Sequence, residues 1–169
     1  AKAIDALQRR LAEADHQLLI ATNDYSPDTE ESQALNLLTR GADALLLCGT
    51  GQRPALLARL AARAVPVVHV MSWPPPPGLV CVGFDNARAM TQVVRYLLDL
   101  GHRRIAMLAG VTQDNDRAAA RVQGVRDALA AANLSLPASR LIERRYALAP
   151  AREGFQRLMQ TASPPTAVV

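Results

Sequence analysis

Two arginines, Arg117 and Arg121, are the residues whose type and spacing most directly suggest ligand chemistry. They stand four positions apart in a stretch with helical periodicity, so their side chains share one face of the predicted helix. A guanidinium presents a fixed fork of hydrogen-bond donors, which suits the hydroxyl groups of a sugar or a carboxylate. Both follow a polar loop, residues 112–116, which itself follows an apolar segment of strand length. The ordinary alternative is a surface ion pair between Arg117 and a neighbouring acidic residue, Asp114 or Asp116.

Further candidates for a binding site follow other apolar segments of strand length. They are Gly49 and Thr50, then Met71, Ser72 and Trp73, and finally Phe84. Trp73 is the only tryptophan and lies beside four prolines, so it could form one wall of a pocket. The flat ring of Phe84 could stack on a sugar ring, and simple core packing is the alternative.

No catalytic or metal-binding motif emerges from the remaining reactive residues. His16 and His69 lack the spacing of a metal site, and His102 has no partner motif nearby, which favours a structural role. Residues 49–51 are not a phosphate-binding loop, because no lysine and hydroxyl residue follow at the required spacing, and no G-x-S-x-G motif is present. Paired acids, bases or nucleophiles are also missing. We therefore expect no enzyme, no metal ion and no cofactor.

The elements that must position these residues alternate along the whole chain. The spacing of apolar residues predicts helices over residues 1–14 (with one buried face), 28–40, 54–63, 86–100, 116–132 and 150–161. It predicts strands over residues 17–22, 44–48, 65–70, 79–83, 105–108, 141–145 and 166–169. Asp85 and Asn86 are predicted to cap the helix that follows them. Such alternation is typical of an α/β fold with parallel sheets, whose ligands bind outside the carboxyl ends of the strands.

Composition and length limit the classes of protein to consider. The 169 residues are 50% hydrophobic and 20% charged, which is typical of a packed domain and not of a disordered tail. The net charge is +4, but Lys2 is the only lysine and aromatic residues make up 4%, so we expect these residues alone not to hold DNA. Cys48 and Cys81 form no disulfide framework and are expected as buried thiols in a reducing compartment. No apolar segment reaches the length of a membrane span, and no signal peptide is visible at the N-terminus.

Three segments resemble one family closely. They are VGFDN at 82–86, LGHRRIA at 100–106, and the pair Asp116-Arg117 followed by R-x-x-G at 121–124. The sequence resembles the effector-binding core of the lactose/galactose repressor family of bacterial transcription regulators, leaning towards the gluconate-type subgroup. The resemblance covers the whole chain. It implies a periplasmic-binding-protein-like fold of two parallel-sheet, three-layer αβα subdomains, incomplete at both ends.

The resemblance also implies boundaries and site residues. The N-terminal subdomain is expected over residues 1–83 and the C-terminal one over 84–169, with the helix-turn-helix and first core strand of the family lying before Ala1. By this resemblance Arg121 matches the arginine that binds the effector, and Arg117 matches a second arginine that some subgroups use for effector binding. Met71 stands where lactose-type members carry an acidic residue, which argues against a lactose-like sugar.

The expected function is therefore a ligand-responsive, cytoplasmic repressor that forms a homodimer. Its core would bind a small sugar, sugar acid or related metabolite and would control the affinity of a separate DNA-binding region for an operator. The expected ligand-binding residues are Arg121, Arg117, Phe84, Trp73, Met71 and Gly49. The alternative is a periplasmic sugar-binding protein of a transport system, which shares this architecture.

Overall fold

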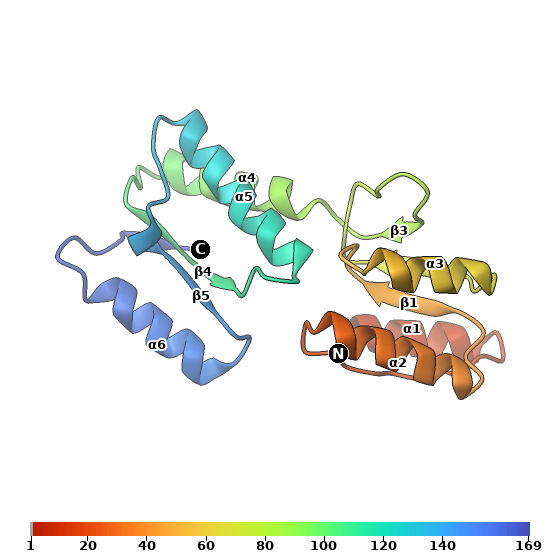
Figure 1. Ribbon diagram of the computed structural model, residues 1–169. Coiled ribbons are helices and arrows are strands. Elements are labelled where there is room, and N and C mark those ends of the chain that lie inside the picture. Colours follow the sequence, from red (N-terminus) through yellow and green to blue (C-terminus); the bar gives the residue numbers. More distant parts are fainter. Residues whose placement is uncertain (1) are drawn as a thin grey trace. The chain divides into compact units, whose positions relative to one another are not determined.

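The computed structural model describes residues 2–169, which form helices and short strands (Figure 1). Helices and strands alternate along most of this range, but α2 follows α1 directly and β3 follows β2 directly. The helices are α1 (Lys2–Ala12), α2 (Pro27–Thr39), α3 (Pro54–Ala62), α4 (Asn86–Asp99), α5 (Asp116–Ala131) and α6 (Leu148–Met159), with a short 3₁₀ turn at Ala138–Arg140. The strands are β1 (Leu45–Cys48), β2 (Val67–Val70), β3 (Cys81–Val82), β4 (Ile105–Gly110), β5 (Leu141–Arg144) and β6 (Ala167–Val168).

Local capping sets where several helices begin and end. Ser26 accepts a hydrogen bond from the backbone of α2, and Asp85 and Asn115 do the same for α4 and α5. Each cap satisfies one of the backbone N–H groups that the first turn of a helix leaves unpaired. Gly41 and Gly101 follow α2 and α4 with positive φ, the conformation in which a helix commonly ends.

The strands form two sheets, with the orders β1-β2-β3 and β5-β4-β6. The pairs β2–β3, β4–β5 and β4–β6 are all parallel. Parallel neighbours require a crossover connection, and α5 supplies it between β4 and β5. Helix α6 connects β5 with β6 of the same sheet, and α4 leads from β3 of one sheet to β4 of the other. The predicted α/β fold with parallel sheets is confirmed.

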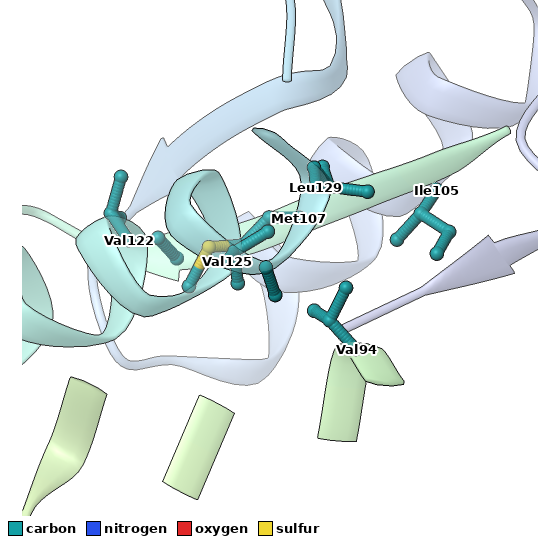
Figure 2. Packing of buried hydrophobic residues seen from close by; sticks show 8 residues of the cluster. Val94, Ile105, Met107, Val122, Val125 and Leu129 are labelled. Carbon is teal, nitrogen blue, oxygen red and sulfur yellow. The ribbon is translucent and has the colours of Figure 1, made fainter. Parts of the chain in front are cut away.

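The best-defined core surrounds β4, which is buried on both faces. Ile105, Met107 and Ala109 pack with residues of α4 and α5 on one face, in the cluster that Figure 2 shows. Ala106 packs with Ile142 and Leu158, from β5 and α6, on the other face. Alternate residues of a strand point to opposite faces, so this arrangement gives three layers. It fixes α4 and α5 together on one side of the sheet.

The chain divides into two compact units, one formed by residues 1–45 and 53–66 and the other by 46–52 and 67–169. The first unit contains α1, α2 and α3. Within it, Leu56 and Leu60 of α3 are fully buried, and Arg59 forms an ion pair with Glu31 of α2 at 2.7 Å. The subdomain boundary expected between residues 83 and 84 stays a prediction.

Three sequence-based expectations are wrong. Residues 17–22 form no strand, because a strand needs a neighbour for its backbone groups and neither sheet of the described chain includes this segment. The predicted buried face of the first helix is only half covered, since α1 contains no buried residue. Cys48 is exposed because burial alternates along β1, where Leu45 and Leu47 occupy the covered face. Cys81, in β3, is only half-buried.

Two global features concern residues 2–169 only. In this range no helix combines the length and the apolar character that crossing a membrane would require. The same residues contain no cluster of three or more His, Cys, Asp or Glu side chains suited to a metal ion.

Candidate functional site

Polar side chains gather where the strands end. Thr50 follows β1, Ser72 follows β2, Asn86 follows β3, Asp116 follows β4 and Tyr146 follows β5. All five lie in the unit formed by residues 46–52 and 67–169. The carboxyl ends of parallel strands are where this class of sheet presents its ligand site, so the topology itself selects these residues.

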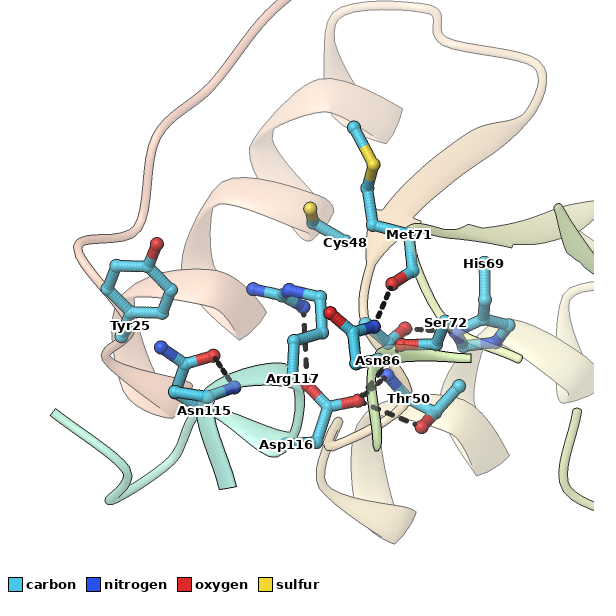
Figure 3. Close-up of polar contacts among 12 residues, drawn as sticks. Tyr25, Cys48, Thr50, His69, Met71, Ser72, Asn86, Asn115, Asp116 and Arg117 are labelled. Atoms are coloured by element: carbon cyan, nitrogen blue, oxygen red, sulfur yellow. Dashed lines mark hydrogen bonds and ion pairs between the residues drawn. The ribbon is translucent and has the colours of Figure 1, made fainter. Parts of the chain in front are cut away.

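Asp116, the first residue of α5, is the centre of one polar network (Figure 3). Its Oδ2 accepts hydrogen bonds from the backbone N–H of Thr50 at 2.7 Å, from Thr50 Oγ1 at 3.0 Å and from Ser72 Oγ at 3.3 Å. Its Oδ1 accepts a hydrogen bond from Arg117 Nη1 at 3.2 Å. A carboxylate at a helix N-terminus is also favoured by the helix dipole. The negative charge of Asp116 is thus well satisfied by groups of the protein.

Gly49 makes room for this network. Its φ is +82°, and a Cβ at this position would overlap the side chains of Arg117 and Asp116. Both facts require glycine here. The carbonyl oxygen of Gly49 accepts a hydrogen bond at 3.0 Å from Nδ1 of His69, a fully buried residue of β2. The turn after β1 is therefore bound by His69 through its backbone carbonyl and packs against the side chain of Arg117.

Arg121 belongs to a second polar network, built from neutral partners. Its Nη1 donates to Asn86 Oδ1 and its Nη2 donates to Tyr146 Oη, each at 2.8 Å. Asn86 Nδ2 in turn donates to the carbonyl oxygen of Met71 at 2.9 Å. The ring of Tyr146 lies against Gly110, where a Cβ would overlap it. This network joins the loops after β2, β3 and β5 through one helical side chain.

The loop between β4 and α5, which leads to both arginines, is fixed by hydrogen bonds to β5 and by the cap of α5. Glu143 of β5 accepts hydrogen bonds from the backbone N–H of Thr112 at 2.8 Å and from its hydroxyl at 2.9 Å. Asn115, which is buried, caps α5 by accepting from Ala118 N at 3.2 Å. The start of α5 is thus attached to β5 and capped locally. Because Arg117 and Arg121 are one turn apart, they project from one face of α5.

A pocket of about 240 Å³ lies at the first network. Its walls come from the turns after β1 and β2 and from the first turns of α4 and α5. The lining residues are Thr50, Ser72, Trp73, Pro74, Asp85, Asn86, Asp116, Arg117 and Ala120.

The structure brings together some of the predicted site residues and not others. Arg117 and Trp73 line the pocket, as does Thr50. Arg121 is joined to the lining residue Asn86, whereas Phe84, Met71 and Gly49 are not among the residues that line it. Phe84 is 52% exposed, so the alternative of core packing for this ring is wrong. The ligand-contacting roles themselves stay predictions.

Asn86 and Tyr146 are the residues that sequence reasoning misplaced or missed. Asp85 caps α4 as predicted, by accepting from Arg88 N at 2.8 Å, but Asn86 does not cap the helix. It is 4% exposed and its side chain points to Met71 and Arg121 instead. The sequence gives one signal for Tyr146, its position after a predicted strand. The predicted ion pair between Arg117 and Asp116 is present.

The site offers groups that can bind a polar ligand. Hydroxyl groups, amides and guanidinium groups offer donors and acceptors, and two exposed aromatic rings, those of Trp73 and Phe84, lie nearby in sequence. The two arginines differ in charge balance. Arg117 pairs with Asp116, whereas within residues 2–169 no carboxylate lies within 4.0 Å of Arg121.

Comparison with known proteins agrees with this architecture. A family model described as periplasmic binding proteins and sugar binding domain of the LacI family matches residues 1–169. The chain is 30% identical over 128 residues to the HTH-type transcriptional regulator GntR of Escherichia coli (strain K12), a match that covers 76% of this chain and 38% of that protein. It is 31% identical over 171 residues to the HTH-type transcriptional regulator RafR of Escherichia coli, covering 98% of this chain and 48% of that protein.

Solved structures show the same fold. The transcription regulator GntR from Chromobacterium violaceum matches with a TM-score of 0.79 and 26% identity, over 91% of this chain and 58% of that one. A LacI family transcriptional regulator from Lactobacillus casei matches with a TM-score of 0.81 and 24% identity, over 98% of this chain and 61% of that one. The chain thus spans between about two fifths and three fifths of the length of these relatives.

Proposed function

The chain belongs to the family of periplasmic binding proteins and sugar-binding domains of the LacI family, and from this premise we propose that it is the effector-binding core of a bacterial transcriptional repressor. The effector is a small sugar, a sugar acid or a related metabolite. Its binding changes the affinity of a separate DNA-binding region of the protein for an operator. Support comes from the relatives, which are named as transcriptional regulators.

The observation that carries this proposal is the pocket at the carboxyl ends of the strands, lined by Arg117, by hydroxyl and amide groups and by Trp73. A sugar needs many directional hydrogen bonds and a flat apolar surface, and a small-molecule site combines these features in one cavity.

Each predicted ligand residue has a proposed role. Arg121 and Arg117 donate hydrogen bonds to a carboxylate or to ring hydroxyls. Trp73 and Phe84, each about half exposed, present ring faces on which a sugar can stack. Met71 and Gly49 shape the turns after β2 and β1, both with positive φ, and so act on the ligand through the backbone.

The regulatory step follows from differential affinity. An effector shifts the protein between two arrangements only by the difference in its binding free energy for them. In a cytoplasmic homodimer, the arrangement that the effector favours would set the spacing of two DNA-binding regions on a two-fold symmetric operator. Oligomeric state is tested by analytical ultracentrifugation of the full-length protein, with and without effector.

Calorimetry on the full-length protein tests the pocket. The probes are D-gluconate, a sugar acid, and D-glucose, its neutral counterpart. Arg121→Ala removes a charged donor, a change that costs roughly 1.5–3 kcal/mol and should weaken binding by about 10- to 150-fold. Arg126→Ala is the matched control, because Arg126 is exposed on the same helix. Equal affinity of the Arg121→Ala variant and the wild type would remove Arg121 from the site.

DNA binding separates this proposal from its alternative. A repressor of this family should bind a palindromic operator taken from the region upstream of its own gene, with an affinity that an effector changes. A transport protein of the periplasm should bind the sugar but no operator. Failure of the full-length protein to bind such DNA under any effector condition would contradict the repressor proposal.

A further inference from the structure

Asn86 makes contacts that capping a helix does not explain. Asp85 already caps α4, so the amide of Asn86 is free for another purpose. The residue is 4% exposed. Its Nδ2 donates to the carbonyl oxygens of Met71, at 2.9 Å, and Phe84, at 3.4 Å, while its Oδ1 accepts from Arg121 at 2.8 Å. Figure 3 shows the contact between Asn86 and Met71. A side-chain amide has a donor NH₂ group and an acceptor oxygen. In Asn86 the donor binds backbone carbonyl oxygens, and the acceptor binds Arg121.

The end of Asn86 that contacts Met71 is attached to rigid backbone. Met71 has a φ of +68°, unusual for a residue with a side chain, and its N–H donates to Val82 O at 3.0 Å. Gly83, which follows β3, packs closely on Met71, since a Cβ at Gly83 would lie 2.9 Å from the carbonyl carbon of Met71. The carbonyl that Asn86 binds therefore cannot move freely. Because Asn86 is bound to this carbonyl, its own side chain is fixed, and it holds the long side chain of Arg121 in one position.

The charge of Asn86 matters as much as its geometry. Aspartate would present the same acceptor to Arg121 but would add a negative charge and lose the donor to Met71. In the described chain both hydrogen-bond partners of Arg121, Asn86 and Tyr146, are neutral, so its positive charge is not cancelled by them. Arg117, one turn earlier, is paired with the carboxylate of Asp116. An uncancelled guanidinium attracts a ligand anion more strongly than a paired one.

We propose that Asn86 is a positioning residue that anchors Arg121 to the Met71 turn while leaving its positive charge available, so that the site prefers ligands with a negative group. This inference rests on the proposed function, because it takes Arg121 as a ligand-binding residue. The anchoring and the charge preference make separate predictions.

Anchoring is tested without any ligand, by NMR of the arginine side-chain N–H groups in the full-length protein, with Arg121→Lys to assign the Arg121 signals. The wild type should show slowly exchanging, separate Nη signals for Arg121, because two hydrogen bonds hold the group. Asn86→Ala should average these signals. Asn86→Asp loses the anchor to Met71 but should keep the signals, because its carboxylate forms a stronger, charge-assisted hydrogen bond with Arg121. Unchanged Arg121 signals in Asn86→Ala would overturn the anchoring role.

Charge preference is tested by calorimetry with D-gluconate and D-glucose. In Asn86→Asp the ratio of the two affinities should fall about tenfold or more, through loss of gluconate binding. The control is Asn133→Asp, the same chemical change at an exposed residue after α5 whose positive φ aspartate tolerates. Equal weakening of both probes in Asn86→Asp would mean a merely structural role and would overturn the charge preference.

The two readouts also separate this inference from the function on which it rests. If the wild type binds neither probe, while the Arg121 signals depend on Asn86 as described, the anchoring stands and the charge preference fails together with the sugar or sugar-acid effector. A variant that fails to fold is recognised by circular dichroism. The same measurement is made on Asn86→Asp, which keeps the acceptor for Arg121 but loses the donor to Met71.

Discussion

Gly124 lies where α5 meets α4, and we expect its replacement by alanine to destabilise the protein. A Cβ at Gly124 would overlap the carbonyl oxygen of Ala87 and would lie 2.8 and 2.9 Å from the carbonyl carbon and Cα of that residue. These are backbone atoms of the first turn of α4 and cannot rotate away. Thr91 Oγ1 donates to the carbonyl oxygens of both Ala87, at 3.0 Å, and Gly124, at 3.1 Å. The two helices are therefore held with their backbones in direct contact.

Two opposing terms decide the magnitude. Alanine is a better helix former than glycine, which favours the Gly124→Ala variant by about 1 kcal/mol. Inserting a methyl group into a tightly packed contact costs about 1–3 kcal/mol, and the rigid backbone of Ala87 argues for the upper end. The net effect should be a loss of about 2 kcal/mol in the free energy of unfolding. For a chain of this size this corresponds to a melting temperature lower by roughly 4–8 °C.

Urea denaturation followed by circular dichroism measures this change. Ala119→Gly is the matched control, because Ala119 is exposed on the same helix and reports the helix-propensity term alone, about 1 kcal/mol of destabilisation. A Gly124→Ala variant as stable as the wild type, or more stable, would refute the reasoning, since propensity would then outweigh the contact with Ala87.

Three further predictions follow from single residues. Gly49→Ala should displace Arg117 and Asp116 and weaken ligand binding about tenfold, measured by calorimetry, because the position has positive φ and no space for a Cβ; unchanged binding would contradict the link between Gly49 and the pocket. Leu129→Ala should lower the free energy of unfolding by about 2–5 kcal/mol in urea, since the side chain is fully buried in the core of Figure 2. Asp85→Ala should cost about 1 kcal/mol in the same assay through loss of the α4 cap, and a change near zero would mean that Asp85 contributes little as a cap.

Most elements were predictable because their signals are local. Apolar spacing, Ser26 before α2, Asp85 before α4 and the glycines after these helices place the helices within a few residues of their observed bounds. The segment at residues 17–22 shows the limit of such signals. Its composition suits a strand, but a strand forms only with a neighbour to share its hydrogen bonds, and the described chain provides none for it.

The candidate site was predictable to the level of the loops and not to the level of contacts. Thr50, Ser72 and Trp73 were found because they follow strands, and the sheet topology brings strand ends together. The hydrogen bond between Asn86 and Arg121 joins residues 35 positions apart on different helices. The sequence predicts a local role for Asn86 as a helix cap, but Asp85 caps the helix instead. No local pattern indicates that the side chain of Asn86 binds Arg121.

Arg117 and Arg121 therefore differ in a way that residue type and spacing do not reveal. Arg117 lies beside a carboxylate that is itself held by Thr50 and Ser72, so its charge is balanced and its contribution to the pocket is largely one of shape and hydrogen bonding. Arg121 is held by two neutral groups, and its charge remains available to a ligand. Because screening by a fixed carboxylate weakens the attraction for a second anion, the partner of each guanidinium, rather than its place on the helix, determines which arginine can distinguish a sugar acid from a neutral sugar.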